Sequence, residues 1–247
     1  MNPLVTVICA VWNRQKDKEA LLRGHMANLQ QQTMAHEVVY VFDEGDAAPD
    51  WLAGSKVSAS EALTIYQAWN VALSLVRTPF VMNLNLDDRL APNAIELLQN
   101  VLEDDPEVVL AAGDWRICFN AEDTDAVRFA YGIEEEPCSP EWPPAPGKRV
   151  RFGSGDGKRA AYGPATLWRM AAHVGYPRYP YRFGDGSLIR VIGDAIWWKL
   201  LENSGRNLIR LPLIIGHYRS DPSSQAEFRT PAEDEFRKFE ALGVALK

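Results

Sequence analysis

The stretch FVMNLNLDD, residues 80–88, decides the fold class, because a strand pattern runs there directly into two acidic residues. Its first half is apolar and rich in β-formers, as expected of a strand that is covered on both faces of a parallel sheet. Pro79 precedes it and ends the helix expected before the strand. Adjacent carboxylates at the end of a buried strand repel each other, and removing them from water is costly. The strongest chemical signal of the chain therefore lies at the carboxyl end of a strand.

Segments on both sides of this stretch alternate between strand and helix patterns. We expect strands over 4–11, 38–42, 80–86 and 108–112, and helices over 17–32, 62–76 (with Ser60 as its N-cap) and 92–103. This order predicts an α/β fold, a Rossmann-like three-layer sandwich with a central mostly parallel sheet. In such sheets ligands bind beyond the carboxyl ends of the strands. The acidic turns 43–46 and 87–88 are expected at those ends.

The remainder of the chain divides into a variable region and a second ordered part. Residues 114–160 are rich in acidic residues, proline and then glycine, which predicts irregular surface structure. Order is expected to resume over 162–172. A helix over 194–203 with Gly205 as its C-cap, a strand over 208–215 and a short amphipathic helix within 230–247 should follow.

Composition excludes several classes of protein. The 247 residues carry 26 Lys and Arg against 33 Asp and Glu, a net charge of −7. This balance argues against broad binding to nucleic-acid backbone or to anionic membranes. No apolar run reaches the roughly 20 residues of a transmembrane helix, and the first residues lack the pattern of a secretion signal. The three cysteines are too scattered for a disulfide framework, so we expect a cytoplasmic protein.

Glycine-rich phosphate motifs are absent where they would be needed. Residues 153–159 do not match the phosphate-binding loop, because the glycine spacing is short by one and Arg159 replaces the required hydroxyl. The first strand is followed by 12–15, WNRQ, without a GxGxxG pattern. A dinucleotide-binding fold and a methyltransferase are therefore disfavoured.

Asp87 and Asp88 support two interpretations on their own. They could bind a hard divalent cation through oxygens, leaving coordination sites for the diphosphate of a nucleotide. They could equally cap the next helix or face water. The dipeptide alone does not decide between these interpretations.

The order of the motifs along the chain adds information that the dipeptide lacks. The motifs of the first half are 5–8, 13–14, 29–33, 39–43, 68–72, 78–81 and 84–88, and those of the second half are 163–169, 174–176, 193–200, Gly205, 211–212 and 218–219. Together they resemble the family-2 glycosyltransferases, enzymes of the GT-A fold. The resemblance spans most of the chain and implies one domain over 1–247. Within it, 1–113 would bind the nucleotide-sugar, 114–160 would be variable, and 161–247 would bind the acceptor.

The resemblance implies a nucleotide pocket around Asn13, Arg14 and Asp43. Asp43, at the end of the second expected strand, resembles the carboxylate that accepts from the base, usually uracil. Asn13 and Arg14 would line the same pocket. The implied donor is a nucleotide-diphosphate sugar, with a UDP-sugar expected first.

The resemblance also implies a metal site at the acidic turn. Asn85 and Asp87 occupy the family's Asp-x-Asp positions, with Asp87 as the ligand of Mn²⁺ or Mg²⁺ and Asp88 as its neighbour in support. His217 or Asp221 would add a metal ligand or a phosphate contact from the C-terminal side. Asn85 departs from the family, which has Asp there, and this removes one negative charge.

Asp194 resembles the second residue of the family's Glu-Asp pair, the general base. Two further departures accompany it. Gly193 replaces the glutamate of that pair, and Trp69 stands where a basic residue is common. Phosphate contacts should therefore come from elsewhere in the chain.

The activity implied is metal-assisted, inverting transfer of a sugar to an acceptor hydroxyl on a glycan or a lipid-linked acceptor. Association with a membrane would then be peripheral, through a partner. Two alternatives stay open: a catalytically silent nucleotide- or glycan-binding relative, and a sugar nucleotidyltransferase. The second should carry a glycine- and arginine-rich loop after the first strand, and residues 12–14 are not one.

Overall fold

The structure, a computed structural model, describes residues 3–125, 130–131, 162–174, 178–221, 223 and 225–245. Most of the segment 114–160, which the sequence predicts to be irregular, lies outside the described residues. Its first part does not follow the expectation, because residues 114–118 continue a strand instead. They pair with 214–219 of another strand, and this ladder extends the sheet beyond the apolar run that marks its start.

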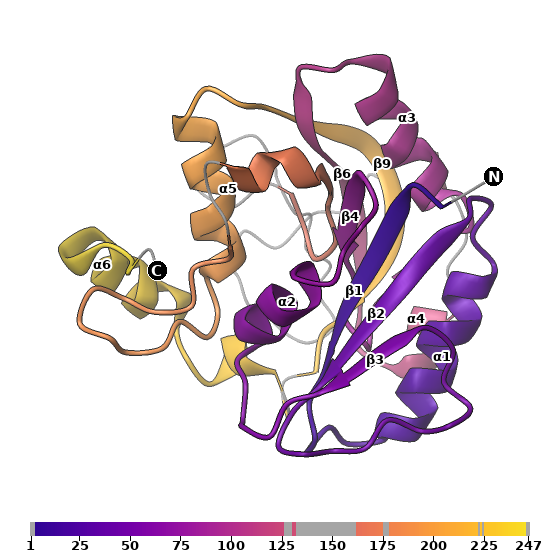
Figure 1. Ribbon diagram of the computed structural model, residues 1–247, viewed down its shortest axis with the longest axis horizontal. Helices are drawn as coiled ribbons and strands as arrows, with labels where there is room; N and C mark the ends of the chain where they lie inside the picture. The colour runs from indigo at the N-terminus through magenta and orange to yellow at the C-terminus, as the bar shows by residue number, and fades with distance from the viewer. Residues whose placement is uncertain are drawn as a thin grey trace.

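One sheet forms the centre of the fold (Figure 1). Its strands run in the order β3-β2-β1-β4-β8-β6-β9-β5, and β7 also pairs with β9. The longest pairings, β1 with β2 and β6 with β9, are parallel, whereas short strands contribute the antiparallel pairs. The strands are β1 Val5–Val11, β2 His36–Phe42, β3 Ser55–Ser58, β4 Phe80–Asn83, β5 Arg89–Leu90, β6 Val108–Cys118, β7 Ala130–Tyr131, β8 Leu167–Arg169 and β9 Asn207–Arg219.

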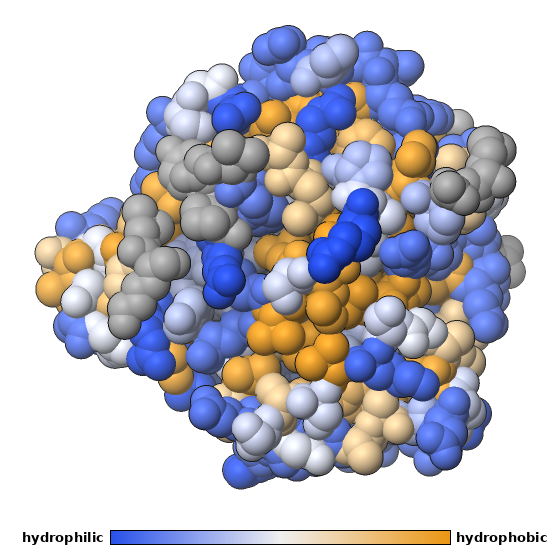
Figure 2. Space-filling model, viewed as in Figure 1, coloured by the Kyte–Doolittle hydropathy of each residue, from blue (hydrophilic) through white to orange (hydrophobic). Residues whose placement is uncertain are grey.

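Helices cover both faces of this sheet, as expected for three layers. They are α1 Lys18–Gln30, α2 Ile65–Leu73, α3 Ala94–Asp104, α4 Ala121–Asp125, α5 Gly193–Asn203 and α6 Ala232–Leu242, with short 3₁₀ turns at Met170–Val174 and Ala226–Phe228. The helices α2 and α5 share one apolar core with β1 and β2, and α1 and α3 pack on the opposite face. Figure 1 shows these two pairs on either side of β1 and β4. On the α2 side the surface is mostly hydrophilic around a central apolar area (Figure 2).

The start of α2 corrects one expectation. The helix begins after Thr64, not after Ser60, because Thr64 forms a capping box. The Gln67 backbone N–H donates to Thr64 Oγ1 at 3.2 Å, and the Thr64 N–H donates to Gln67 Oε1 at 3.0 Å. Two of the helix's first N–H groups are satisfied in this way, and Ser60 offers no equivalent partner three residues on.

The end of β4 corrects another. The strand stops at Asn83, three residues earlier than expected. The Asn83 amide donates to the Pro164 carbonyl at 2.9 Å, and the Thr166 N–H donates to Asn83 Oδ1 at 3.2 Å. The chain then turns, with the Asp88 N–H donating to the Asn85 carbonyl at 3.2 Å. Residues 85–88 therefore form a turn at the carboxyl edge of the sheet.

Gly205 ends α5 as expected. Its φ of 76° lies in the left-handed region, where glycine carries no penalty. The Gly205 N–H donates to the Glu202 carbonyl and the Arg206 N–H to the Leu201 carbonyl, the two bonds of a Schellman motif. No helix in the described part of the chain is both long and apolar enough to cross a bilayer.

Candidate functional site

Asp43 joins two loops at the carboxyl ends of β1 and β2. Its Oδ1 accepts a hydrogen bond from the Asn13 N–H at 2.7 Å, and its Oδ2 accepts one from the Leu63 N–H at 3.2 Å. The side chain is buried. Asp43 thus fixes the position of the 12–17 loop relative to the segment that enters α2.

Ion pairs connect the same two loops at the surface. Arg14 pairs with Glu44 at 3.1 Å. Lys18 pairs with Asp46 and also donates to the Asn13 carbonyl at 3.2 Å. The structure therefore brings Asn13, Arg14 and Asp43 together, as the sequence predicts, although Arg14 is engaged by Glu44.

The acidic turn carries oxygens that lack partners. Asp88 is fully buried, and its Oδ1 accepts from the Arg219 N–H at 3.0 Å. Its Oδ2 and Asn85 Oδ1 are buried and have no hydrogen-bond partner among the described residues. Asp87 is half-buried, with Oδ2 3.4 Å from the Gln225 amide nitrogen. Three oxygen-bearing side chains therefore sit within one short turn, two of them with a buried oxygen that makes no hydrogen bond within 3.5 Å. The Asn85 side chain also lies close enough to the Asp88 carboxylate to lower the pKa of Asp88 slightly against the effect of burial.

Electrostatics at this turn favour an added positive charge. Burial raises the pKa of Asp87, an effect that the positive charges of Arg219 and Arg89 only partly offset. Burial and then the negative charge of Asp87 raise the pKa of Asp88 well above its usual range. A further positive charge beside Asp87 and Asp88 would stabilise the ionised form of both carboxylates.

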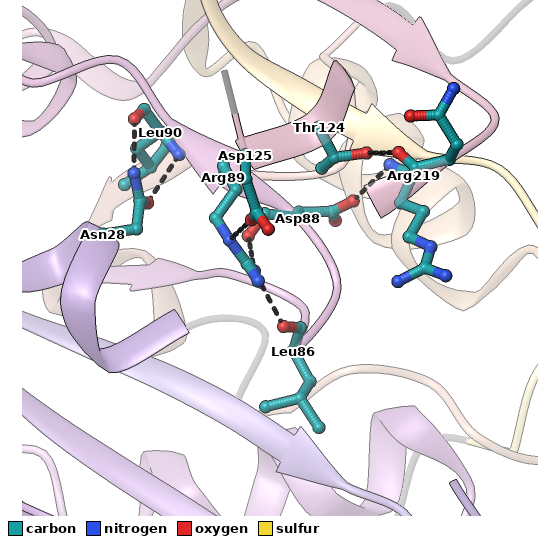
Figure 3. Close-up of polar contacts among 9 residues, drawn as sticks. Asn28, Leu86, Asp88, Arg89, Leu90, Thr124, Asp125 and Arg219 are labelled. Carbon is teal, nitrogen blue, oxygen red and sulfur yellow. Dashed lines mark hydrogen bonds and ion pairs between the residues drawn. The ribbon is translucent and has the colours of Figure 1, made fainter. Parts of the chain in front are cut away.

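Arg89 binds the backbone of the acidic turn through its side chain (Figure 3). Its Nη1 donates to the carbonyls of Leu86 and Asp88, at 3.0 and 2.8 Å, so the guanidinium binds the backbone on both sides of Asp87. Its Nε donates to Asp125 of α4 at 2.7 Å. Because Arg89 is buried, these bonds keep the turn in one conformation.

Asn28 of α1 provides a second anchor. Its amide donates to the Leu90 carbonyl and accepts from the Leu90 N–H, both at 2.8 Å, as a neighbouring strand would (Figure 3). Arg89 directly follows the acidic pair in the sequence, but nothing in the sequence assigns a role to Arg89 or to Asn28. Their role appears only once α1 is packed beside β5.

Gly24 makes room for the Arg89 guanidinium. A Cβ at this position would lie 2.2 Å from Arg89 Nη2. In an unconstrained helix Gly→Ala stabilises by roughly 0.5–1 kcal/mol. We expect the opposite sign for Gly24→Ala, a loss of about 1–3 kcal/mol from overpacking, measured by urea unfolding. A more stable Gly24→Ala protein would contradict the inference that the Arg89 guanidinium is held in one position beside Gly24.

Asp194 lies in the first turn of α5 and is oriented by its neighbours. Its Oδ1 accepts from the Ala195 N–H at 2.8 Å and lies 3.3 Å from the Tyr66 hydroxyl. Tyr66, on α2, donates to the Val191 carbonyl at 2.6 Å. A Cβ on Gly193 would lie 2.7 Å from the Pro180 carbonyl and from the Tyr66 ring. Packing therefore excludes a glutamate at Gly193.

Trp69 is a core residue, which explains why a basic residue, common at this position in the family that the chain resembles, is absent here. It is buried, with its ring 5.6 Å from Tyr66 and 5.1 Å from Tyr179.

Basic groups lie instead beside Asp87. Lys16 and Arg219 line a small pocket there, together with Gln15, Asp17, Leu21 and Asp221. The motif at 218–219 includes Arg219, but nothing in the sequence places Lys16 or Arg219 next to Asp87.

Trp12 is a second group that the sequence analysis missed. It follows β1 directly, and its side chain is 40% exposed, one of the few large hydrophobic side chains exposed among the described residues. An exposed indole next to Asn13 offers a flat apolar face at the mouth of the site.

A larger hollow lies where β6 and β9 begin, away from the carboxyl ends of β1, β2 and β4. Tyr162, Glu202 and Arg206 are among the residues that line it.

The metal ligands expected from the sequence are only partly assembled. His217 is buried on β9 and pairs across the strands with Arg89 of β5. No group of three His, Cys, Asp or Glu side chains that could hold a metal ion occurs in the described ranges. The oxygens of Asp87, Asp88 and Asn85 fit a hard cation, whose remaining ligands would be oxygens of a bound substrate or water.

Comparisons with known proteins match the fold. No protein-family model and no curated protein sequence matches the chain. Among solved structures, the chain is similar to residues 1–349 of S. aureus TarS in complex with UDP-GlcNAc, with a TM-score of 0.60, 14% identity, and coverage of 96% of this chain and 64% of that one. It is also similar to the mannosyltransferase PcManGT from Pyrobaculum calidifontis in complex with GDP-Man and Mn²⁺. That match has a TM-score of 0.58 and 16% identity, and it covers 93% of this chain and 60% of that one.

A third similarity is to a CMP:2-keto-3-deoxy-manno-octonic acid synthetase complexed with CTP, with a TM-score of 0.50, 12% identity and 98% coverage of both chains. At these identities the similarity concerns the fold, which is the α/β fold of GT-A glycosyltransferases, as expected. The chain spans about three-fifths of the length of the two transferase chains.

Proposed function

We propose that the protein is a metal-assisted, inverting glycosyltransferase that uses a nucleotide-diphosphate sugar. One observation carries the proposal: buried, unpartnered oxygens of Asp88 and Asn85 lie beside Asp87, at the carboxyl edge of a GT-A sheet. A divalent cation bound there would supply positive charge beside these oxygens, and a diphosphate would supply the ligands that the described side chains lack.

The donor would bind across the ends of β1, β2 and β4. Asp43 and Asn13, which are bonded to each other at this edge, would contact the base, and the exposed Trp12 would stack on it. The Arg219 guanidinium extends away from Asp88 (Figure 3) and has no partner among the described residues, so it is available for a phosphate. We expect the nucleotide part of the donor to be UDP, because Asp43 resembles a carboxylate that binds uracil.

Asp87 would be the principal protein ligand of Mn²⁺ or Mg²⁺, with Asp88 and Asn85 in support and His217 as a further ligand from β9. When bound, the cation stabilises the charge that develops on the departing diphosphate. The acceptor oxygen attacks the anomeric carbon from the face opposite the diphosphate, and the carbon–oxygen bond to the diphosphate breaks. Asp194 takes the proton from the acceptor hydroxyl. The acceptor would be a glycan or a lipid-linked hydroxyl.

A second candidate is a sugar nucleotidyltransferase. It is supported by the similarity in length to the synthetase chain, since each covers nearly all of the other. Against it stands the loop after β1, where Trp12, Asn13 and Arg14 replace a glycine- and arginine-rich turn. The products separate the two, because a transferase releases nucleoside diphosphate and a nucleotidyltransferase releases pyrophosphate.

The deciding experiment incubates the protein and Mn²⁺ with a panel of nucleotide-sugars and measures released nucleoside diphosphate. A parallel panel of CTP or UTP with sugar phosphates measures pyrophosphate. Slow release of diphosphate from one donor supports the transferase. Pyrophosphate release supports the second candidate, and nucleotide binding without turnover of any donor supports a silent binding protein.

Arg219→Ala separates phosphate recognition from base recognition. We expect about a tenfold loss of affinity for UDP, the size of one charged hydrogen bond to phosphate. Affinity for uridine should not change, because the base pocket lies on the β1 and β2 side. Titration calorimetry measures both, with the exposed Arg77→Ala at the opposite edge of the sheet as control. Equal losses for UDP and uridine would contradict the placement of Arg219 at the diphosphate.

A further inference from the structure

Glu235, on the C-terminal helix α6, is a buried carboxylate with long-range partners. It is 5% exposed. Its Oε1 accepts from the Arg190 N–H at 2.8 Å, and its Oε2 accepts from the N–H groups of Val191 and Ile192 at 3.0 and 3.1 Å. These three residues immediately precede Gly193 and Asp194. The side chain thus binds the backbone at the entry to α5.

The three hydrogen bonds of Glu235 stabilise both its buried charge and the loop that leads into α5. Hydrogen bonds to an ionised group contribute about twice as much as neutral ones, and three of them together compensate for burying the charge. Other contacts keep α6 near the same loop. The Ala245 N–H donates to the Arg182 carbonyl, and the Gly184 N–H donates to the Gly243 carbonyl. The C-terminal segment is therefore fastened to the loop that precedes Asp194.

A second side chain holds the same loop from the opposite side. The Tyr66 hydroxyl donates to the Val191 carbonyl at 2.6 Å. Val191 therefore has both backbone polar groups bonded to side chains, one from α2 and one from α6. Asp194 follows three residues later, with its Oδ1 on the Ala195 N–H. The position of the first turn of α5 is set from two distant parts of the chain.

We propose that Glu235 is a positioning residue for Asp194, acting through the backbone of 190–192; this rests on the proposed role of Asp194 as the base. A side chain at Gly193 could not take this role, because Tyr66 and the Pro180 carbonyl fill that space. The carboxylate comes instead from α6. The C-terminal helix is thereby part of the catalytic apparatus.

Glu235→Gln tests this, since it keeps the size of the side chain but presents an amide to N–H donors. The exposed Glu240→Gln on the same helix is the matched control. Amide hydrogen exchange at Ala195 reports whether the Asp194 carboxylate still accepts the Ala195 N–H, and it can be measured without enzyme activity. We expect Glu235→Gln to speed this exchange about tenfold or more, as one lost charged hydrogen bond predicts, and Glu240→Gln to leave it unchanged.

Kinetics supply the second readout. We expect Glu235→Gln to lower kcat about tenfold or more, with KM for the donor and UDP affinity within about twofold of wild type. Unchanged Ala195 exchange, or faster exchange with unchanged kcat, would overturn the proposal. If no donor is turned over by wild-type protein, the proposed function fails, and Ala195 exchange alone decides whether Glu235 positions Asp194. Should Glu235→Gln fail to fold by circular dichroism, Glu235→Asp, which keeps the charge on a shorter side chain, decides by the same exchange.

Discussion

Replacing Asp194 by asparagine will lower kcat for sugar transfer about 10²- to 10⁴-fold, the usual contribution of a general base. Asparagine keeps the size of the side chain, and its amide oxygen can still accept from the Ala195 N–H that holds Oδ1. It cannot accept the acceptor proton. The affinity for UDP should not change, because Asp194 lies on α5, whereas the proposed donor site lies at the ends of β1, β2 and β4.

The measurement pairs released nucleoside diphosphate in the presence of acceptor with UDP titration calorimetry. Asp104→Asn is the matched control, an exposed carboxylate at the end of α3, away from α5 and α6. Transfer by Asp194→Asn at the wild-type rate would remove Asp194 from the mechanism. A silent binding protein would be indifferent to this substitution in every assay.

Replacing Asp87 by alanine will abolish the part of UDP affinity that depends on Mn²⁺. Asp87 is the more exposed of the two carboxylates and faces the pocket that Lys16 and Arg219 line. We expect at least about a 10²-fold loss of affinity in Mn²⁺, since losing even an outer-shell partner of a metal costs 10- to 100-fold. In EDTA, wild type and variant should bind UDP equally weakly.

Calorimetry with and without Mn²⁺ tests this, with Asp104→Ala, an exposed carboxylate at the end of α3, as the control. Removing Asp87 also takes a negative charge away from Asp88, whose raised pKa depends on it. The folded variant should therefore be no less stable than wild type in the absence of metal. Wild-type UDP affinity of Asp87→Ala in Mn²⁺ would show that the metal assignment is wrong.

Much of the fold follows from local pattern. The strands at 5–11, 36–42 and 108–112 and the helix α5 appear where apolar periodicity predicts them. The errors occur where a side chain overrides the pattern. Asn83 ends β4 early by bonding to 164–166, and Thr64 starts α2 late through its capping box. β3 was missed because Ser55–Ser58 is mostly exposed and has no apolar run.

The candidate site divides in the same way. Residues on one loop, such as Asp87 and Asp88, are visible in the sequence because they follow a strand. The roles of Arg89, Arg219 and Glu235 are not visible there, although 218–219 is one of the family motifs, because each acts across a long stretch of chain. Arg89 meets Asp125, the Arg219 N–H meets Asp88, and Glu235 meets the loop before α5. Only packing brings such pairs together, and a single sequence records no packing.

The central claim is that the acidic turn at 85–88 holds a cation which in turn binds a diphosphate. A crystal grown with Mn²⁺ and UDP, with diffraction measured at the manganese absorption edge, tests it most directly. We predict an anomalous peak for manganese within coordination distance of an Asp87 carboxylate oxygen, with both phosphates of UDP around it and Arg219 turned toward them. A nucleotide bound elsewhere, or manganese distant from Asp87 and Asp88, would contradict the account.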